Sequence, residues 1–344
     1  MQLDAIEART FPVHAGEAQV PDEVVAIDRL TFESWGGGLS LAQYLERERR
    51  LRACAYSQGL RQWVLREGRE ILASCESYAV PFVVSSADGS RTKAGLGHGI
   101  ASVYVEERLR GRGYAGEMLR RIHDGLRKEG ALCAYLMSEI GPSLYARLGY
   151  VARPLRLCRF AAVDPAREAP HPEDWTWLGE ADVPARLQVA FGAAVARPGL
   201  SIETTPAQID WHLSRGRYYA EKLARKPAVR VGAAAGEAFV LWQPEYRRGA
   251  LQVLTLWPGR TLWREGQRDP RSREAADLRN VLHAARAAAT ELGLSTVEIW
   301  ETPRSATFLR GGARVEAKEL PMLLPLAAGV RAEDWSDYER AHWL

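Results

Sequence analysis

Cysteine is scarce in this chain of 344 residues, which has four: Cys54, Cys75, Cys133 and Cys158. They stand far apart, and none belongs to a Cys-x-x-Cys pair or to a Cys/His cluster that could bind zinc. This distribution argues against a structural metal site and is typical of a reduced cytoplasmic protein.

Long apolar runs are also missing. No segment approaches the ~20 apolar residues that a membrane-spanning helix needs. The first residues lack the basic stretch and apolar core of a secretory signal. The 46 Lys and Arg against 43 Asp and Glu leave a net charge of only +3, so no global field attracts DNA or RNA. We therefore expect a cytoplasmic protein whose partners include neither a membrane nor a nucleic acid.

Apolar residues, in contrast, make up 47% of the chain, which is enough for one or two cores. The length exceeds that of a usual single domain. Residues 164–175, DPAREAPHPEDW, are rich in proline and charge, as a linker between domains would be. We predict two domains, at residues 1–162 and 170–344.

The first half alternates strands and helices around one unusual turn. After a strand over 95–107, the stretch RLRGRGYAGEML at 108–119 packs arginine and glycine together and then takes up helical apolar spacing. A buried strand at 131–139 and a short helix at 142–149 follow. The expected order is strand, glycine turn, helix, strand, helix.

A glycine-rich turn before a helix can direct several backbone N–H groups to one point, where the helix N-terminus adds positive charge. That arrangement suits a phosphate, and an ordinary connecting turn is the alternative. An RNA-binding segment would be repeated and disordered, whereas this stretch is single and lies inside a folded unit. The dinucleotide-binding and Walker patterns are absent.

Residues 103–122, VYVEERLRGRGYAGEMLRRI, resemble the coenzyme A signature of the GNAT superfamily of N-acetyltransferases, R/Q-x-x-G-x-G/A, matched by Arg108, Gly111 and Gly113. LYARLGY at 144–150 resembles its second signature, with Tyr145 four residues before Gly149. The resemblance implies an α/β (α+β) GNAT fold, with a mixed, mostly antiparallel sheet and flanking helices, followed by a degenerate GNAT-like C-terminal domain.

A narrower resemblance is to the fungal lysine N6-acetyltransferases. It rests on WGGGLSLAQYLERERRLR at 35–52, on the glycine turn and on LMSEIGPSLYARLGY at 136–150, with VEIWE at 297–301 as a fainter echo. An aspartate is commoner in that family at the position of Glu139, which keeps the carboxylate but shifts it by one methylene.

The resemblance implies acetyl-CoA as co-substrate and no metal. The backbone of Val103 and Val105, otherwise plain core residues, would pair with the pantetheine arm. The phosphates would lie on a loop formed by Arg108, Arg110, Gly111, Arg112, Gly113 and Ala115.

The same resemblance makes Tyr145 the acid that protonates the coenzyme A sulfur; otherwise it is a packed helix residue. For the base we prefer Glu139, whose alternative role is to pair with an arginine. His98, Glu106, Glu107 and His123 also lie near in chain order, although His123 falls on the polar face of its helix, and a chain of waters could replace any single base.

The acceptor pocket is predicted to involve Glu139 again, together with Trp35, which could instead be a buried core residue. Trp300 and Glu301 from the second half are expected to close it. The acceptor would be a small primary amine, with the side-chain amine of free L-lysine as candidate. A polyamine or aminoglycoside-like metabolite, or a non-catalytic acyl-CoA-binding regulator, are the alternatives; the chain would be a monomer or homodimer.

The second half repeats the first in outline and ends in a strand at 319–326. Glu301 corresponds to Glu139, and Phe308 lies four residues before Gly312 as Tyr145 does before Gly149. Phe308 has the ring without the hydroxyl, and the glycine spacing of the turn is missing. The first half therefore carries the residues that both signatures require, whereas the second half repeats only the order of strands and helices.

Overall fold

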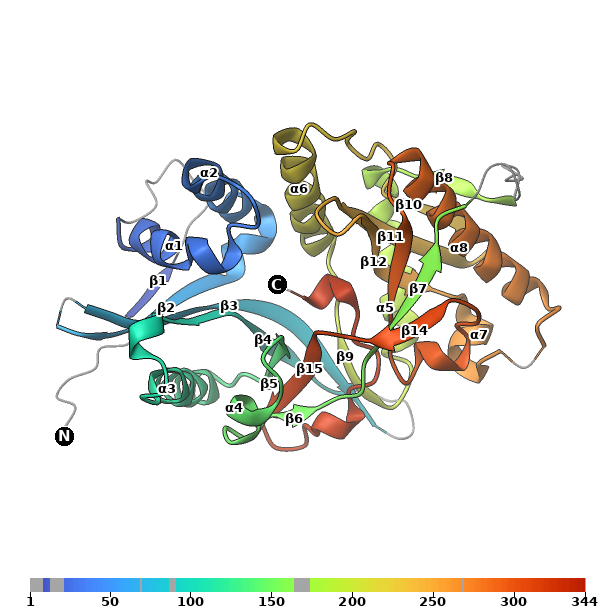
Figure 1. Cartoon of the computed structure of the whole chain (residues 1–344). Helices are drawn as coiled ribbons and strands as arrows, with labels where there is room; N and C mark the ends of the chain where they lie inside the picture. The colour runs from blue at the N-terminus through green and yellow to red at the C-terminus, as the bar shows by residue number, and fades with distance from the viewer. Residues whose placement is uncertain are drawn as a thin grey trace.

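The computed structural model describes residues 9–12, 22–68, 70–86, 91–163, 174–267 and 269–343. It contains two mixed sheets with helices packed on them (Figure 1). In each sheet all neighbouring strands run antiparallel except one pair, β4 and β5 in the first sheet and β12 and β13 in the second. This confirms the predicted mixed, mostly antiparallel architecture.

The first sheet has the order β1-β2-β3-β4-β5-β15-β6, and β9 pairs with β3 beside this path. Its strands are β1 (Arg9–Pro12), β2 (Leu60–Glu67), β3 (Glu70–Ser85), β4 (Arg91–Val105), β5 (Cys133–Ser138), β6 (Val151–Ala152), β9 (Gly199–Ile202) and β15 (Leu320–Pro325).

The second sheet has the order β14-β7-β13-β12-β11-β10-β8. Its strands are β7 (Arg156–Ala161), β8 (Thr176–Leu178), β10 (Gly232–Ala235), β11 (Ala238–Glu245), β12 (Ala250–Trp257), β13 (Thr296–Glu301) and β14 (Ala313–Glu316).

The two sheets exchange one strand each. β7 follows the first half of the chain but pairs with β13 and β14 in the second sheet. β15 comes from the second half and pairs with β5 and β6 in the first. The strand predicted at 319–326 therefore lies in the first sheet, where its partners come from about 180 residues earlier in the chain. The ranges 1–162 and 170–344 stay a prediction as folding units.

Helices of the first half cover both faces of its sheet, with α1 (Asp22–Trp35) and α2 (Leu41–Arg52) on one face and α3 (Tyr114–Lys128) on the other (Figure 1). Ser40 caps α2, since its hydroxyl accepts from the Gln43 N–H while the Gln43 side chain accepts from the Ser40 N–H. The amphipathic pattern of α3 is also confirmed, because its apolar residues are buried against the sheet.

The remaining helices are the short α4 (Ser143–Ala146), followed by α5 (Val183–Ala194), α6 (Pro206–Lys222), α7 (Arg260–Glu265) and α8 (Arg273–Glu291). Helix α6 packs against α2 of the first half, where the Tyr218 hydroxyl approaches the Gln43 carbonyl oxygen. The C-terminal end of the chain lies between the halves (Figure 1). None of the helices in the described ranges has the length and apolar character required to span a bilayer.

Candidate active site

The first sheet opens between its two parallel strands. β4 and β5 are paired only through His98–Ala134 and Gly99–Tyr135. Further along β4, Ser74 on β3 faces Tyr104 while Glu76 faces Ala101, so residues 102–103 form a bulge. Ser102 accordingly has φ +52°, a conformation that costs a residue other than glycine about 1–2 kcal/mol. Strand β4 thus diverges from β5 over 100–105, which include Val103 and Val105.

The glycine turn at 108–113 is an open cradle. Gly111 and Gly113 have φ +78° and +88°, and a Cβ at either position would meet no atom within 4 Å. Gly113 leads directly into α3, whose first turn contains the half-buried Ala115. Several backbone N–H groups can therefore approach an anion without obstruction, which fits the phosphates of coenzyme A.

The arginines of the turn differ in their contacts. Arg108 is held by Glu106, at 2.7 Å, and by Glu70. Arg110 Nε donates to the Val105 carbonyl at 3.1 Å, which ties the turn to the end of β4. Arg110 and Arg112 are both exposed, so their guanidinium groups have room to meet a phosphate.

A cavity of about 420 Å³ lies next to the opening between β4 and β5. Four of the predicted site residues line it: Trp35, Val103, Glu139 and Tyr145. Its walls come from α1, α2, β3, β4, β5 and α4 of the first half, and from α6, the turn after β11 and the C-terminal end of the second. Trp35 is half-buried, with its ring edge-on to Tyr104 at 5.8 Å.

Tyr145 combines burial with a free hydroxyl. Its ring lies edge-on to Tyr150 at a centroid distance of 5.9 Å. Burial raises the pKa of Tyr145 to about 12, so the hydroxyl stays protonated at neutral pH. Within the described part of the chain, no hydrogen-bond partner is found for it. A phenol kept protonated beside the cavity is able to donate its proton.

Of the five candidate bases, only Glu139 lines the cavity. It is exposed at the end of β5 and has no ion-pair partner in the described ranges, so the alternative of a pairing arginine finds no support there. Glu106 is bound to Arg108, and neither it nor Glu107 reaches the cavity.

The two histidines are structural. Burial lowers the pKa of both His98 and His123 to about 4. His123 lies 2.9 Å from the Tyr150 hydroxyl, so its expected place on a solvated face is wrong. Among the described residues, no group of three His, Cys, Asp or Glu side chains gathers so as to hold a metal ion.

Trp300 and Glu301 do not reach this cavity, contrary to the prediction. Trp300 borders a separate cavity of about 40 Å³ in the second half, where Arg340 lies over its ring at 4.8 Å. Glu301 is buried between Arg156 and Arg314. The physical reason is that both residues belong to β13 of the second sheet, whereas the cavity lies beside the first sheet.

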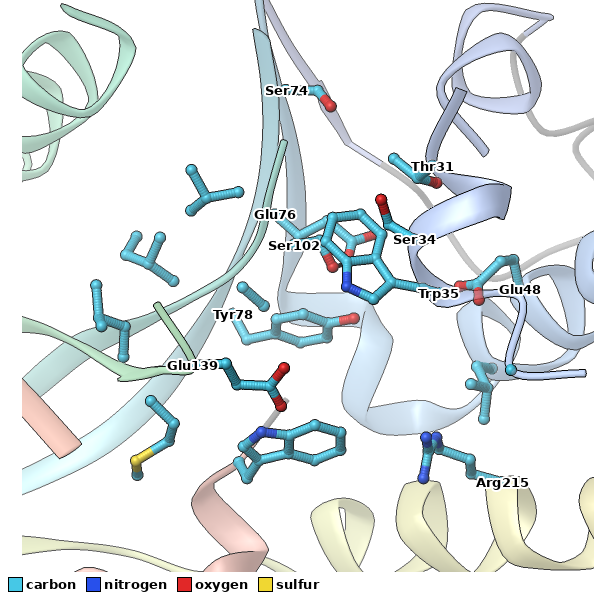
Figure 2. A pocket seen from close by; sticks show the side chains of 18 of the residues that line it. Thr31, Ser34, Trp35, Glu48, Ser74, Glu76, Tyr78, Ser102, Glu139 and Arg215 are labelled. Atoms are coloured by element: carbon cyan, nitrogen blue, oxygen red, sulfur yellow. Dashed lines mark hydrogen bonds between the residues drawn. The ribbon is translucent and has the colours of Figure 1, made fainter. Parts of the chain in front are cut away.

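An acidic wall that the sequence analysis missed faces the cavity from α1 and β3. Asp28 accepts from both terminal nitrogens of Arg52 at 2.6 Å, and all these groups are buried. Glu76 accepts from the Ser102 hydroxyl at 3.0 Å, and burial raises its pKa. Figure 2 shows Glu76 and Ser102 side by side. A glutamate inside the apolar β3 run was the available signal, since such a residue is rarely buried without a role.

A basic wall from α2, α6 and the turn after β11 was also missed; it comprises Arg47, Arg215 and Arg247. The second half thus contributes arginines to the cavity in place of Trp300 and Glu301. The available signal was Arg215 on a helical stripe with Trp211 and Tyr219, spaced by four residues, where an apolar residue would be expected.

Comparison with protein families accounts for both halves. Residues 164–343, more than half of the chain, match the LYC1 GNAT-like C-terminal domain. Residues 22–152 match the acetyltransferase (GNAT) domain. The chain belongs to the LYC1-like GNAT family. It is therefore an acyltransferase of the GNAT type, as the resemblance implied.

Solved structures share the fold of this GNAT protein across both halves. A GCN5-related N-acetyltransferase from Kribbella flavida is 20% identical, with a TM-score of 0.53 over 93% of this chain and 72% of the other. A probable N-acyltransferase from Enterococcus faecalis V583 is 11% identical, with a TM-score of 0.59 over 94% and 73%. A GCN5-related N-acetyltransferase from Anabaena variabilis ATCC 29413 is 11% identical, with a TM-score of 0.57 over 93% of this chain and 73% of the other. No curated protein matches the chain.

Proposed function

We propose that the protein transfers the acetyl group of acetyl-CoA to a small primary amine, and that the side-chain amine of free L-lysine is its acceptor. The observation that carries the proposal is the place of Tyr145. Its hydroxyl has no hydrogen-bond partner among the described residues, and Tyr145 borders a cavity of about 420 Å³ beside an opened pair of strands, the first of which leads into the glycine turn. The lysine assignment is supported by the match to the LYC1 GNAT-like C-terminal domain.

Acetyl-CoA supplies an activated acyl group, and the chain's residues would hold it in place. The backbone N–H groups around Gly111 and Gly113 would bind phosphate oxygens, assisted by Arg110 and Arg112. The edge of β4 at Val103 and Val105, past its pairing with β5, would take the pantetheine arm like an additional strand.

The transfer requires two proton movements. A lysine ammonium has a pKa of about 10.4, so its deprotonation near pH 7 costs roughly 4–5 kcal/mol. Glu139, exposed at the cavity and without an ion pair in the described ranges, would accept this proton directly or through water. The nitrogen then forms a bond to the acyl carbon, the carbon–sulfur bond breaks, and the Tyr145 hydroxyl gives its proton to the sulfur.

Tyr145→Phe tests this proposal. We expect free-thiol release from acetyl-CoA in the presence of L-lysine to fall about 10²- to 10⁴-fold, the usual contribution of a general acid, while calorimetry shows coenzyme A still bound. Tyr150→Phe is the matched control. It removes a hydroxyl that contacts His123 outside the cavity, and should leave turnover near that of the wild type.

Two outcomes would contradict the proposal. Full turnover by Tyr145→Phe would remove that residue from the mechanism. A wild-type protein that binds coenzyme A but releases no thiol with lysines, ornithine, polyamines or an aminoglycoside would be a regulator. The cytoplasmic location, the absence of a nucleic-acid partner and the state as monomer or homodimer stay predictions.

A further inference from the structure

Three arginines of the cavity wall surround one aromatic ring. The guanidinium carbons of Arg47, Arg215 and Arg247 lie 5.8, 5.3 and 4.7 Å from the ring centroid of Tyr219. All three line the cavity. An arginine stays protonated even when buried, so three positive charges are concentrated on this side.

Among the described residues, two carboxylates form ion pairs with these three guanidinium groups. Glu48 accepts from Arg47 Nε at 2.9 Å. Glu245 accepts from Arg247 through both oxygens, at 2.9 and 3.1 Å, and therefore meets Arg215 only at 3.4 Å. The Arg215 side chain is only 11% exposed, and burial lowers its pKa, the sign of a cation with too little compensation. The three guanidinium groups therefore carry one positive charge more than their two carboxylates neutralise, and Arg215 forms the longest ion pair of the three.

The opposite wall shows the reverse balance. Arg52 is engaged by both oxygens of Asp28 and approaches Glu76 only at 3.4 Å. Two carboxylates thus share one cation, and Glu76 is left with the Ser102 hydroxyl as its close partner. Figure 2 shows Glu76 on the sheet side of the cavity and Arg215 on the opposite side, rising from α6.

We propose that Arg215 binds a carboxylate of the acceptor while Glu76 faces the ammonium to be acetylated, so that these two residues select an amino acid over a simple amine. The planar guanidinium fork suits a carboxylate. The charged groups of a polyamine or an aminoglycoside are all cationic. Such an acceptor could not neutralise Arg215 and would be repelled by the basic wall. The inference rests on the proposed function and assigns the residues that select its acceptor.

The first experiment changes only the acceptor. L-lysine is compared with L-lysinamide, whose carboxylate is replaced by an amide, and with cadaverine, the same diamine without a carboxyl carbon. From the loss of a charge-assisted contact we expect kcat/KM for L-lysine to exceed the other two about 100-fold, mainly through KM. Equal kcat/KM for the three amines would overturn the carboxylate subsite.

The second experiment changes the arginine. Arg215→Gln should reduce the preference for L-lysine over cadaverine from about 100-fold to less than about 5-fold, and Arg215→Lys should fall between, because it keeps the charge without the fork. Arg217→Gln is the control on the same helix. It removes an exposed side chain paired with Glu180 and Asp210 outside the cavity, and should keep the preference. A preference unchanged in folded Arg215→Gln would overturn the assignment.

Calorimetry separates this inference from the proposed function. Wild-type protein with coenzyme A bound should bind L-lysine about 100-fold more tightly than cadaverine, whether or not it turns over. Thiol release absent with every amine would overturn the proposed function, yet tighter binding of L-lysine would still support the subsite. Equal affinities would overturn the subsite even in an active enzyme, and this comparison stands if the Arg215 variants do not fold.

Discussion

The two halves of the molecule place equivalent strands in the same order, β2-β3-β4-β5-β15-β6 in one and β10-β11-β12-β13-β7-β14 in the other. Each contains one parallel pair, and beside it lies the strand received from the other half. Each also has a bulge just past the last paired residues of the parallel pair, at 102–103 in β4 and at Leu254 in β12. The scaffold is therefore shared down to its irregularities.

What differs is the chemistry around the bulge. In the first half Ser102 and Glu76 put polar groups there, whereas in the second Leu254 and Trp242 put apolar ones. The cavity beside β12 and β13 has only about 40 Å³ and is bordered by residues 337–340 of the chain's own C-terminal segment. Because both halves have an opened pair of strands, that opening alone does not make a site. The polar residues at the bulge, and the segment that fills or leaves free the space beside it, make the difference.

The largest expected difference concerns acetyl-CoA affinity, and it depends on the glycine that begins the helix after each bulged strand. Gly113 and Gly259 both begin helices with φ near +90°, so valine strains the backbone at either position. Gly113→Val should also obstruct the N–H groups and weaken acetyl-CoA binding about 100-fold, the loss expected for two charge-assisted hydrogen bonds. Gly259→Val should affect stability alone, since Pro258 removes one N–H and α7 has only six residues. Calorimetry measures the acetyl-CoA affinity of both variants. An equal loss of affinity in the two would contradict the predicted difference between the halves.

Phe308→Tyr is a second test of the difference between the halves, because it adds to the second half the hydroxyl that Tyr145 carries in the first. Phe308 is 1% exposed and packs near Trp263. A new hydroxyl in this core should cost about 1–3 kcal/mol of unfolding free energy in urea denaturation, without producing a second coenzyme A site. Two bound coenzyme A molecules per chain, or rescue of Tyr145→Phe by this change, would show the second half to be a dormant enzyme.

Local patterns in the sequence were sufficient to predict the glycine turn, the helix after it and the short helix that contains Tyr145. The turn at 108–113, helix α3 and Tyr145 were predictable because glycine spacing, apolar periodicity and a short signature each involve neighbouring residues. The exchange of β7 and β15 was not predictable, since the pairing of residues as far apart in the chain as Leu320 and Ser138 leaves no local pattern in the sequence.

The acceptor side depended on long-range packing in the same way. Arg215 belongs to a helix of the second half, and only the packing of α6 against α2 brings it to a cavity built mostly from the first. The repeat itself misled the assignment of Trp300 and Glu301. Trp300 borders the second half's own small cavity, and Glu301, the counterpart of Glu139, is buried in ion pairs with Arg156 and Arg314. An internal alignment by itself cannot distinguish these surroundings from those of the open cavity.

The smallest expected effect concerns what keeps that second cavity closed. Glu339 anchors the C-terminal segment to β12, since its carboxylate accepts from Thr255 at 2.9 Å and from Thr204 at 3.2 Å. Burial raises the pKa of Glu339 to about 8, whereas an unfolded glutamate has a pKa of about 4.3. Between these values the folded state binds more protons than the unfolded one, so this residue makes stability fall as pH rises from about 4 to 8.

Glu339→Gln cannot lose that proton and keeps an oxygen to accept from both threonines. Its Tm should therefore decline less than that of the wild type between pH 5 and pH 8.5, by about 5 °C. Glu333→Gln, at an exposed position of the same segment, should follow the wild-type curve. Parallel Tm curves for Glu339→Gln and the wild type would mean that the carboxylate is solvated. The closure of the second cavity would then depend on the apolar contacts of Tyr338 and Phe308 rather than on this buried anchor.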